Sequence, residues 1–303
     1  MPTHRSILLR DGGLTVGVQP ACGGALTRFD VQRGDAAVEI LRPVEEAAQE
    51  ETSVLATACF PLIPYGGRLR EGRFRFAGKE YRFPLNARPE RHSSHGNGWM
   101  RSWELVRVGR RSVLMRLPAD DSIPFRYEAT QSIRIESNRV RIVLSARNLG
   151  GEDIPVGFGL HPYFAKRETA TVTAALPLQW RWDCELMPVR CEANTLAAAL
   201  GAGCRAMSLP VAAEYAGWDG RAIVNWPASG VRVTLTTAPP LSHVVVWAPE
   251  GEEFFCFEPM SHATDALNAY PGRPAAQDFV ILAPGQVARQ GFEFTVTADR
   301  APR

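Results

Sequence analysis

The chain lacks any long apolar run. No stretch of its 303 residues approaches the ~18 consecutive apolar residues that indicate a membrane-spanning helix. Near the start only residues 7–9 are apolar in succession, and Arg10 and Asp11 follow them directly. That run is too short for the hydrophobic region of a secretory signal peptide, so we expect a cytoplasmic protein with no membrane partner.

The sequence also lacks closely spaced cysteine pairs and an excess of one charge. Its six cysteines are scattered without CxxC spacing, which is typical of reduced thiols. The 34 basic and 32 acidic residues are interspersed, with a formal net charge of +2 and no block of five like charges. This pattern excludes the basic surface typical of nucleic-acid-binding proteins, so no nucleic-acid partner is expected.

Several common functional motifs are missing. The sequence contains no GxxxxGK[ST] and no GxSxG, and the pair Gly157 and Gly159 fails to complete GxGxxG because Pro162 occupies the third glycine position. His92 and His95 have a spacing that two zinc ligands can use, but no third ligand of suitable spacing is near them. We therefore expect neither a dinucleotide site nor a metal site.

What the sequence does contain is a series of alternating apolar residues. Residues 73–83 and 129–148 each alternate on both sides of a polar turn, which predicts two hairpins with one buried face. Residues 230–237 and 292–299 alternate in the same way. Residues 243–259 carry two continuous apolar runs around a polar turn, which is typical of strands buried on both faces.

Helical patterns are few. Residues 191–200 predict two to three helical turns ended by Gly201, while 23 prolines and 26 glycines punctuate the rest of the chain. We find no linker and no tandem repeat. The sequence therefore predicts an all-β fold, with residues 1–303 forming a single large antiparallel domain.

Four short motifs carry side chains suited to acid–base chemistry or hydrogen bonding. Arg68 follows two glycines in PYGGRLREGRF, His95 lies in SHGNGW, His161 lies in LHPYF, and Glu258 lies in FFCFEPM. An imidazole exchanges protons near neutral pH, and burial raises the pKa of a carboxyl group and makes it a better base. Taken singly, each residue also has a structural explanation, as a core or loop histidine, a salt-bridged glutamate or a surface arginine.

In their order and spacing, these motifs resemble those of the aldose 1-epimerases, also called galactose mutarotases. The resemblance extends from about residue 15 to residue 297, and it rests on the arginine loop before GRFRFAGKEYRFPLN and on SHGNGW, LHPYF and FEPMSHATDALN. It implies a large antiparallel β-sandwich, the galactose mutarotase-like supersandwich. It also implies cofactor-independent interconversion of the α and β anomers of a small-molecule sugar, by a monomer or a homodimer.

The same resemblance implies a role for each site residue. Glu258 is similar to the general base of the family and His161 to its general acid, while Arg68, His95 and Asp219, in AGWDGR, are similar to its sugar-binding residues. The base would remove the proton of the anomeric hydroxyl while the acid protonates the ring oxygen, which opens the ring. Rotation about C1–C2 and reversal of these steps would then give the other anomer.

The chain departs from the family pattern beside these motifs. Gly67 stands before Arg68 where family members commonly have Asn, and Ala165 and Lys166 replace the usual residues after LHPYF. The loss of one hydroxyl contact at position 67 leaves the identity of the sugar open and favours a diverged subgroup.

Two alternatives to a mutarotase of neutral sugars remain. A hexose-6-phosphate 1-epimerase would need additional cations for the phosphate, for which Arg70, Arg73 and Arg101 are candidates beside Arg68. A non-catalytic sugar-binding protein on the same fold is the other alternative, although both His161 and Glu258 are retained. The sequence does not identify which tryptophan stacks on the sugar.

Overall fold

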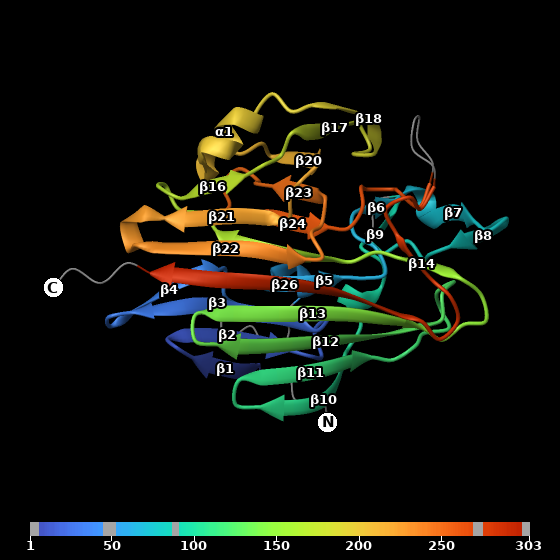
Figure 1. Ribbon diagram of the computed structural model, residues 1–303, viewed down its shortest axis with the longest axis horizontal. Coiled ribbons are helices and arrows are strands. Elements are labelled where there is room, and N and C mark those ends of the chain that lie inside the picture. The colour runs from blue at the N-terminus through green and yellow to red at the C-terminus, as the bar shows by residue number, and fades with distance from the viewer. Residues whose placement is uncertain (1–5, 45–52, 87–90, 269–274, 299–303) are drawn as a thin grey trace.

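The structure of the protein is a computed structural model that describes residues 6–44, 53–86, 91–268 and 275–298. Within these ranges nearly all regular structure is β, and antiparallel strands form two large sheets that lie one behind the other (Figure 1). This architecture confirms the predicted all-β fold, a large antiparallel β-sandwich.

The first sheet has eleven strands in the described part of the chain. They are β1 (Ile7–Asp11), β2 (Leu14–Gln19), β3 (Ala25–Arg33), β4 (Ala36–Leu41), β5 (Cys59–Leu62), β15 (Gly159–Ala165), β17 (Leu178–Trp182), β18 (Pro188–Ala193), β20 (Ala212–Ala216), β23 (His243–Trp247) and β24 (Phe254–Met260). The order across the sheet is β1-β2-β3-β4-β15-β24-β23-β20-β17-β18, and β5 pairs with β15 and β3.

The second sheet has nine strands among the described residues, and Figure 1 shows it in front of the first. They are β10 (Glu104–Gly109), β11 (Ser112–Leu117), β12 (Tyr127–Glu136), β13 (Arg139–Asn148), β16 (Thr171–Ala174), β19 (Cys204–Arg205), β21 (Arg221–Trp226), β22 (Val231–Ala238) and β26 (Val287–Ala298). The order is β10-β11-β12-β13-β26-β22-β21-β16-β19.

Short elements connect the two sheets. Three two-stranded ladders pair β6 (Arg68–Leu69) with β9 (Ser93–Ser94), β7 (Arg73–Phe76) with β8 (Lys79–Arg82), and β14 (Ile154–Val156) with β25 (Val280–Leu282). The helical elements among the described residues are α1 (Ala197–Ala202) and the 3₁₀ turns η2 (Val54–Ala56), η3 (Arg70–Gly72), η4 (Gly98–Met100), η5 (Ala206–Ser208) and η6 (Pro227–Ser229).

Large aromatic side chains fill the space between the two sheets. Phe29 on β3 and Phe164 on β15 contact Phe294 on β26, with ring centroids 5.8 and 6.4 Å apart. Trp226 on β21 packs against Phe164 at 6.5 Å, and all four rings are buried. Removing this much apolar surface from water is the main favourable term in folding, and it fixes the first sheet as a rigid support.

The predicted hairpins form at the predicted places. Residues 73–83 become β7 and β8, residues 129–148 become β12 and β13, and residues 243–259 become β23 and β24. In β12 and β13 buried positions alternate with partly buried or exposed positions, whereas every residue of β24 is buried. The prediction of two buried faces therefore holds for β24 but not for β23, where Val245 is only partly buried and Trp247 is exposed.

The predicted helix at residues 191–200 is partly wrong. Residues 191–193 belong to β18, where Cys191 pairs with Trp180 of β17, and the helix α1 starts only at Ala197. The backbone N–H of Asn194 donates to Pro177, which separates the strand from the helix. Strand pairing with β17 thus outweighs the local helix preference of this alanine-rich segment.

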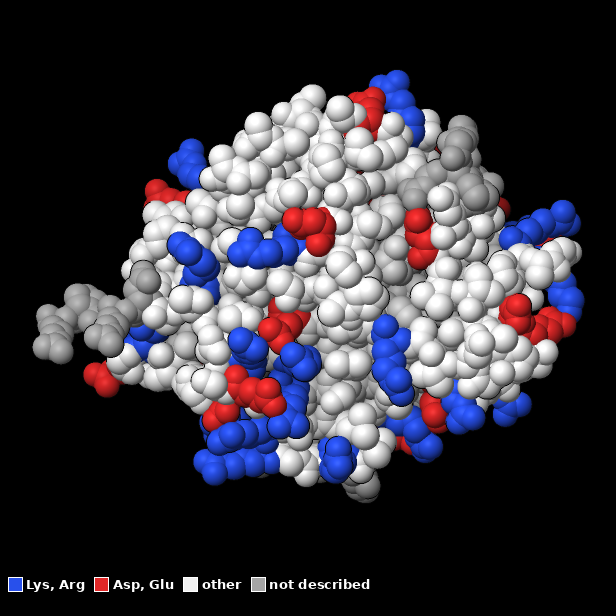
Figure 2. Space-filling view, viewed as in Figure 1, with Lys and Arg blue, Asp and Glu red and all other residues white. Residues whose placement is uncertain are grey.

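The surface carries both charges side by side. Figure 2 shows basic and acidic side chains intermixed over the face formed by the second sheet. Arg141 pairs with Glu293 at 2.8 Å and Arg116 pairs with Glu104 at 2.5 Å, in both cases across neighbouring strands. No helix in the described ranges has the length and apolar character needed to cross a membrane.

Candidate active site

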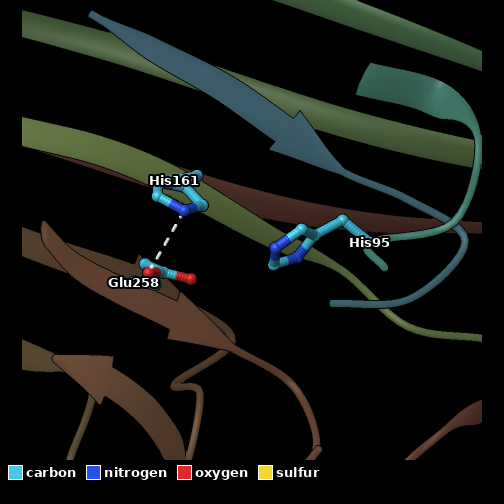
Figure 3. A group of neighbouring side chains, drawn as sticks. All are labelled: His95, His161 and Glu258. Carbon is cyan, nitrogen blue, oxygen red and sulfur yellow. Dashed lines mark ion pairs between the residues drawn. The ribbon is translucent and has the colours of Figure 1, made fainter. Parts of the chain in front are cut away.

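His161 and Glu258 face each other across two paired strands. β15 and β24 run antiparallel with Tyr163 opposite Cys256, so two residues along each strand His161 lies opposite Glu258. Cross-strand partners project from the same face of a sheet. Figure 3 shows the imidazole and the carboxyl group pointing toward one another, with Nε2 of His161 3.3 Å from Oε1 of Glu258.

Burial controls the protonation of this pair, because the two side chains are only 7% and 4% exposed. Desolvation raises the pKa of Glu258 to about 8, although the nearby Arg68 acts in the opposite direction. Desolvation also lowers the pKa of His161 well below its ordinary value, and His95 adds to this effect. Near neutral pH the pair therefore holds one titratable proton, which resides on the carboxyl group of Glu258, while the imidazole of His161 is neutral.

Aromatic rings hold the imidazole of His161 in place. It stacks on Phe60 of β5 and on Tyr163, with ring centroids 4.5 and 4.7 Å apart. Its Nδ1 atom is buried and has no hydrogen-bond partner among the described residues. Ring packing thus sets the orientation, and Nε2, which faces Glu258, is the nitrogen at which proton exchange takes place.

His95 reaches the same place from the loop after β9. Its backbone has a φ of 58°, in the left-handed region that non-glycine residues rarely adopt. Two hydrogen bonds with Gly67 hold it there: the N–H of His95 donates to the carbonyl of Gly67 at 2.8 Å, and the N–H of Gly67 donates to Nδ1 of His95 at 3.1 Å. Because Nδ1 accepts a hydrogen bond, the neutral ring carries its proton on Nε2 and acts there as a donor.

Arg68 is positioned by the short ladder between β6 and β9. It pairs with Ser94, the residue before His95, so the ladder places the guanidinium group and the imidazole beside each other. Arg68, His95, His161 and Glu258 all line a cavity of about 350 Å³. This volume is at the lower end of the range for small-molecule sites, about 300–1,000 Å³. Four of the five site residues expected from the sequence thus share one cavity.

The remaining walls of the cavity are largely aromatic or aliphatic. They are formed by Arg42, Leu55, Gly67, Ser94, Trp99, Tyr163, Trp182, Leu186, Ala212, Val245, Trp247, Phe254 and Thr264. Three tryptophans are therefore available to pack against the apolar face of a ligand. Trp99 is almost fully buried, whereas the side chain of Trp247 is 36% exposed.

A buried carboxyl group that the sequence analysis missed connects two of these walls. Glu214 on β20 is fully buried; its Oε2 accepts a hydrogen bond from the indole N–H of Trp182 at 3.0 Å, and its Oε1 accepts one from the backbone N–H of Thr264 at 2.6 Å. The sequence signal that could have identified it is its place in the short, mostly apolar strand AAEYA, of which Ala213 to Ala216 are all buried.

The structure does not bring Asp219 to the cavity. The residue is exposed in the turn between β20 and β21, and its Oδ1 accepts a hydrogen bond from the backbone N–H of Arg221 at 3.0 Å. A carboxylate that bonds its own backbone two residues on is a common turn-stabilising arrangement. The buried carboxyl group near the site is Glu214, five residues earlier in the chain.

His262, outside the cavity lining, supports the loop that precedes Arg68. The backbone N–H of Gly66 donates to Nε2 of His262 at 3.1 Å, and Nδ1 of His262 donates to the carbonyl of Ala263 at 2.8 Å. The ring also stacks on Phe279, with centroids 4.1 Å apart. Desolvation lowers the pKa of His262 to about 4, so the ring stays neutral and keeps accepting from Gly66.

His95, His161 and Glu258 are also residue types that can hold a metal ion. Ligand atoms of His95, His161 and Glu258 lie within 4.8 Å of one another. Coordination by Nε2 of His95 would require the ring proton to move to Nδ1, which faces the N–H of Gly67. Two opposed donors repel, so the hydrogen bonding of His95 favours a hydrogen-bond donor over a metal ligand.

The sequence matches the family model for aldose 1-epimerases over residues 5–295. The chain belongs to the aldose 1-epimerase family. Its similarity to the uncharacterized Escherichia coli K12 protein YphB is 29% identity over 247 residues, which covers 76% of this chain and 80% of that protein. It also matches the uncharacterized E. coli K12 protein YihR, at 28% identity over 105 residues, or 34% of each chain.

Solved structures with the aldose 1-epimerase fold superpose on the chain. A proposed aldose 1-epimerase from E. coli K12 has a TM-score of 0.86 and 26% identity, covering 97% of this chain and 99% of that one. A galactose mutarotase-like protein from Clostridium acetobutylicum has a TM-score of 0.82 at 16% identity, covering 97% and 95% of the two chains. The second likeness is evidence of a shared fold alone.

The glycine at position 67, where aldose 1-epimerases commonly have Asn, has a local explanation. Gly67 has a φ of 67°, and a Cβ atom there would lie 2.5 Å from Oγ1 of Thr264. Thr264, which lines the cavity, thus occupies the room that a side chain at position 67 would need. The glycine at position 67 thus fits against Thr264, which is almost two hundred positions away in the chain. Sequence patterns do not reveal that these two residues are neighbours.

Proposed function

We propose that this protein is a mutarotase, an aldose 1-epimerase that interconverts the α and β anomers of an aldose without a cofactor. The observation that carries the proposal is the separation of 3.3 Å between Nε2 of His161 and Oε1 of Glu258, both at the wall of a cavity of monosaccharide size. In a pyranose, the hydroxyl O1 and the ring oxygen O5 are bonded to the same carbon. An acid and a base that serve both atoms must therefore be close neighbours.

The pair supplies one acid and one base whichever member holds the proton. The shared proton resides on Glu258, because burial raises the pKa of Glu258 to about 8 and lowers the pKa of His161. The roles implied by the family, Glu258 as base and His161 as acid, require the proton on the imidazole. One proton transfer between the two atoms converts the first arrangement into the second, so the ring can be opened and closed from either face.

Two further groups act as donors in this mechanism. Nε2 of His95 carries a proton toward the cavity, and Arg68 contributes a guanidinium group beside Glu258. Donors aimed at an oxygen stabilise the negative charge that develops as its proton leaves or as the C1–O5 bond breaks. Asp219 has no part in the proposed mechanism, since it lies outside the cavity.

The first prediction tests catalysis directly. Glu258→Gln removes the carboxyl group of the pair while keeping its shape, so mutarotation of freshly dissolved α-aldoses should fall by roughly 10²–10⁴-fold. Polarimetry or exchange NMR with galactose, glucose and glucose 6-phosphate measures the rate over the spontaneous reaction. A folded variant with the wild-type rate would contradict the assignment of Glu258, and a wild-type protein that binds sugars without accelerating any of them would be a sugar-binding protein.

The rim arginines expected for a hexose-6-phosphate 1-epimerase are engaged elsewhere. Arg70 lies within 4.0 Å of Asp183, Glu185 and Asp265. Arg101 pairs with Asp120 and donates to the carbonyl of Pro118, and neither Arg73 nor Arg101 lines the cavity. Of the four arginines that the sequence offered for a phosphate, only Arg68 lines the cavity.

A further inference from the structure

A cation that neither the sequence motifs nor the proposed mechanism uses lies in the cavity wall. Arg42 directly follows β4 and is half-buried. Its Cζ atom lies 3.6 Å from the ring centroid of Tyr163 and 4.3 Å from that of Phe254, and both rings also line the cavity. Such cation–π contacts hold a guanidinium group in place without neutralising its charge.

The hydrogen bonds of Arg42 go to uncharged backbone carbonyl groups. Nε donates to the carbonyl of Thr57 at 3.0 Å, and Nη2 donates to the carbonyl of Leu55 in η2. No carboxylate in the described ranges lies within 4.0 Å of this guanidinium group, in contrast to Arg70 and its three acidic neighbours. A partly desolvated cation is costly, and a ligand that brings an anion lowers this cost.

The lining of the cavity holds more cations than carboxyl groups. The residues that line it include two arginines, Arg42 and Arg68, and a single carboxyl group, Glu258. Because burial raises the pKa of that carboxyl group to about 8, it is mostly uncharged near neutral pH. The charge on the lining therefore favours an anionic ligand over a neutral one.

We propose that the substrate is an aldose carrying an anionic group at the end of the carbon chain remote from C1, and that Arg42 binds this group. The inference rests on the proposed function and names its substrate class. A carboxylate, as in a hexuronate, and a phosphate, as in a hexose 6-phosphate, share the chemistry that a guanidinium group recognises, namely two or more oxygens bearing negative charge.

The geometry of the wall agrees with this placement. Tyr163 stacks on His161 and also contacts Arg42, so one aromatic ring connects the reacting pair to the cation. In a pyranose, the substituent on C5 lies on the other side of the ring oxygen from C1. A sugar with C1 at His161 and Glu258 can therefore extend this substituent along Tyr163 toward Arg42.

The test compares matched sugars and matched arginine variants. Mutarotation of glucose, glucuronate and glucose 6-phosphate is measured with the wild-type protein, Arg42→Gln and the control Arg101→Gln, which removes an arginine outside the cavity. We expect kcat/KM for at least one anionic sugar to exceed that for glucose by roughly 10- to 100-fold, the effect of one charge-assisted hydrogen-bonded pair. Which anionic sugar is preferred distinguishes the carboxylate from the phosphate.

Arg42→Gln should remove this preference, chiefly by raising KM for the anionic sugar, whereas the Arg101→Gln control should keep the wild-type preference. Because Arg42 also anchors η2, Arg42→Lys serves as a second variant that keeps the charge and loses the paired backbone hydrogen bonds. Retention of part of the preference in Arg42→Lys supports the role of charge. Equal kcat/KM for neutral and anionic sugars, or a preference that survives in Arg42→Gln, overturns the proposal.

Equilibrium binding separates this inference from the proposed function. Calorimetric titration of the wild-type protein and Arg42→Gln with glucuronate, glucose 6-phosphate and glucose requires no catalysis. Tighter binding of an anionic sugar that depends on Arg42 supports the inference even if no sugar is epimerised, in which case the proposed function alone fails. Binding that is equally weak for all three sugars overturns the inference, whatever the mutarotation assay shows.

Discussion

At the scale of single residues, the chemistry depends on how two side chains share a proton. An exposed histidine and an exposed glutamate would both be charged at mildly acidic pH and would form an ordinary ion pair. Here burial penalises both charges, so the pKa of Glu258 is raised and that of His161 is lowered. The neutral form of the pair is therefore favoured, and the proton remains available for transfer to a sugar oxygen.

The pH dependence of mutarotation follows from this arrangement. Above about pH 8 the loss of the proton from Glu258 leaves the pair without an acid, so kcat/KM should fall. On the acid side, kcat/KM should fall only well below the ordinary histidine pKa of 6.5, where His161 becomes protonated and the pair loses its base. A pH series of kcat/KM by polarimetry, corrected for the spontaneous rate, measures both limbs.

An acid limb centred at the ordinary histidine pKa would contradict this prediction. The two limbs describe the pair rather than either residue alone, because the two groups interact at 3.3 Å. Glu258→Gln should eliminate the alkaline limb, since an amide does not titrate in this range. An alkaline limb that persists in the residual activity of Glu258→Gln would have to come from another group.

At the scale of elements, β20 connects the two walls of the cavity through Glu214. We predict that Glu214→Gln destabilises the protein by about 1–3 kcal/mol, because an amide retains only one acceptor for two buried donors. Trp182 and Thr264 line the cavity, but neither belongs to the reacting pair of His161 and Glu258. KM should therefore rise by a larger factor than kcat falls, and thermal unfolding together with sugar kinetics measures both effects.

A control for this variant lies on β18, two strands from β20 in the same sheet. Glu192 on β18 is partly exposed and pairs with Arg181, so Glu192→Gln makes the same chemical change where solvent screens the charges. It should leave the melting temperature and KM almost unchanged. Equal effects of the two substitutions would show that Glu214 has no special part in shaping the cavity.

The sequence predicted individual elements better than their partners. The alternating runs at residues 129–148 and the continuous apolar runs at residues 243–259 located four strands, because the apolar pattern of a strand is set locally. The segment at residues 191–200 was predicted as a helix, but its first residues pair with β17, a contact that the local pattern does not contain. Asp219 was expected at the site from the family resemblance, but only the structure shows that it faces solvent in the turn after β20.

At the scale of the whole molecule, buried neutral histidines make stability depend on pH. The pKa of His262 is lowered to about 4 by burial, against 6.5 for the free side chain. Between these values the unfolded chain binds a proton that the folded protein does not, so the free energy of unfolding decreases as pH falls from 6.5 toward 4. Each unit of pKa difference corresponds to about 1.4 kcal/mol, which gives a total of about 3 kcal/mol for this residue.

Replacing the imidazole should reduce this dependence. His262→Gln keeps an acceptor for the N–H of Gly66 and removes the titrating group, so its stability should change less than that of the wild type as pH falls toward 4. Urea unfolding of both proteins at a series of pH values measures the two slopes, and the difference at neutral pH gives the part that does not depend on protonation. Parallel curves for the two proteins would exclude His262 as a source of acid sensitivity.

The sequence by itself determined the strand periodicity, the β class and the ordered motifs that carry Arg68, His95, His161 and Glu258. Only the tertiary structure decided that these motifs meet in one cavity and that Arg42 joins them. The reason is that side-chain alternation depends on neighbouring residues, whereas cavity walls, burial and protonation depend on strands such as β15 and β24 that pair across large distances in the sequence.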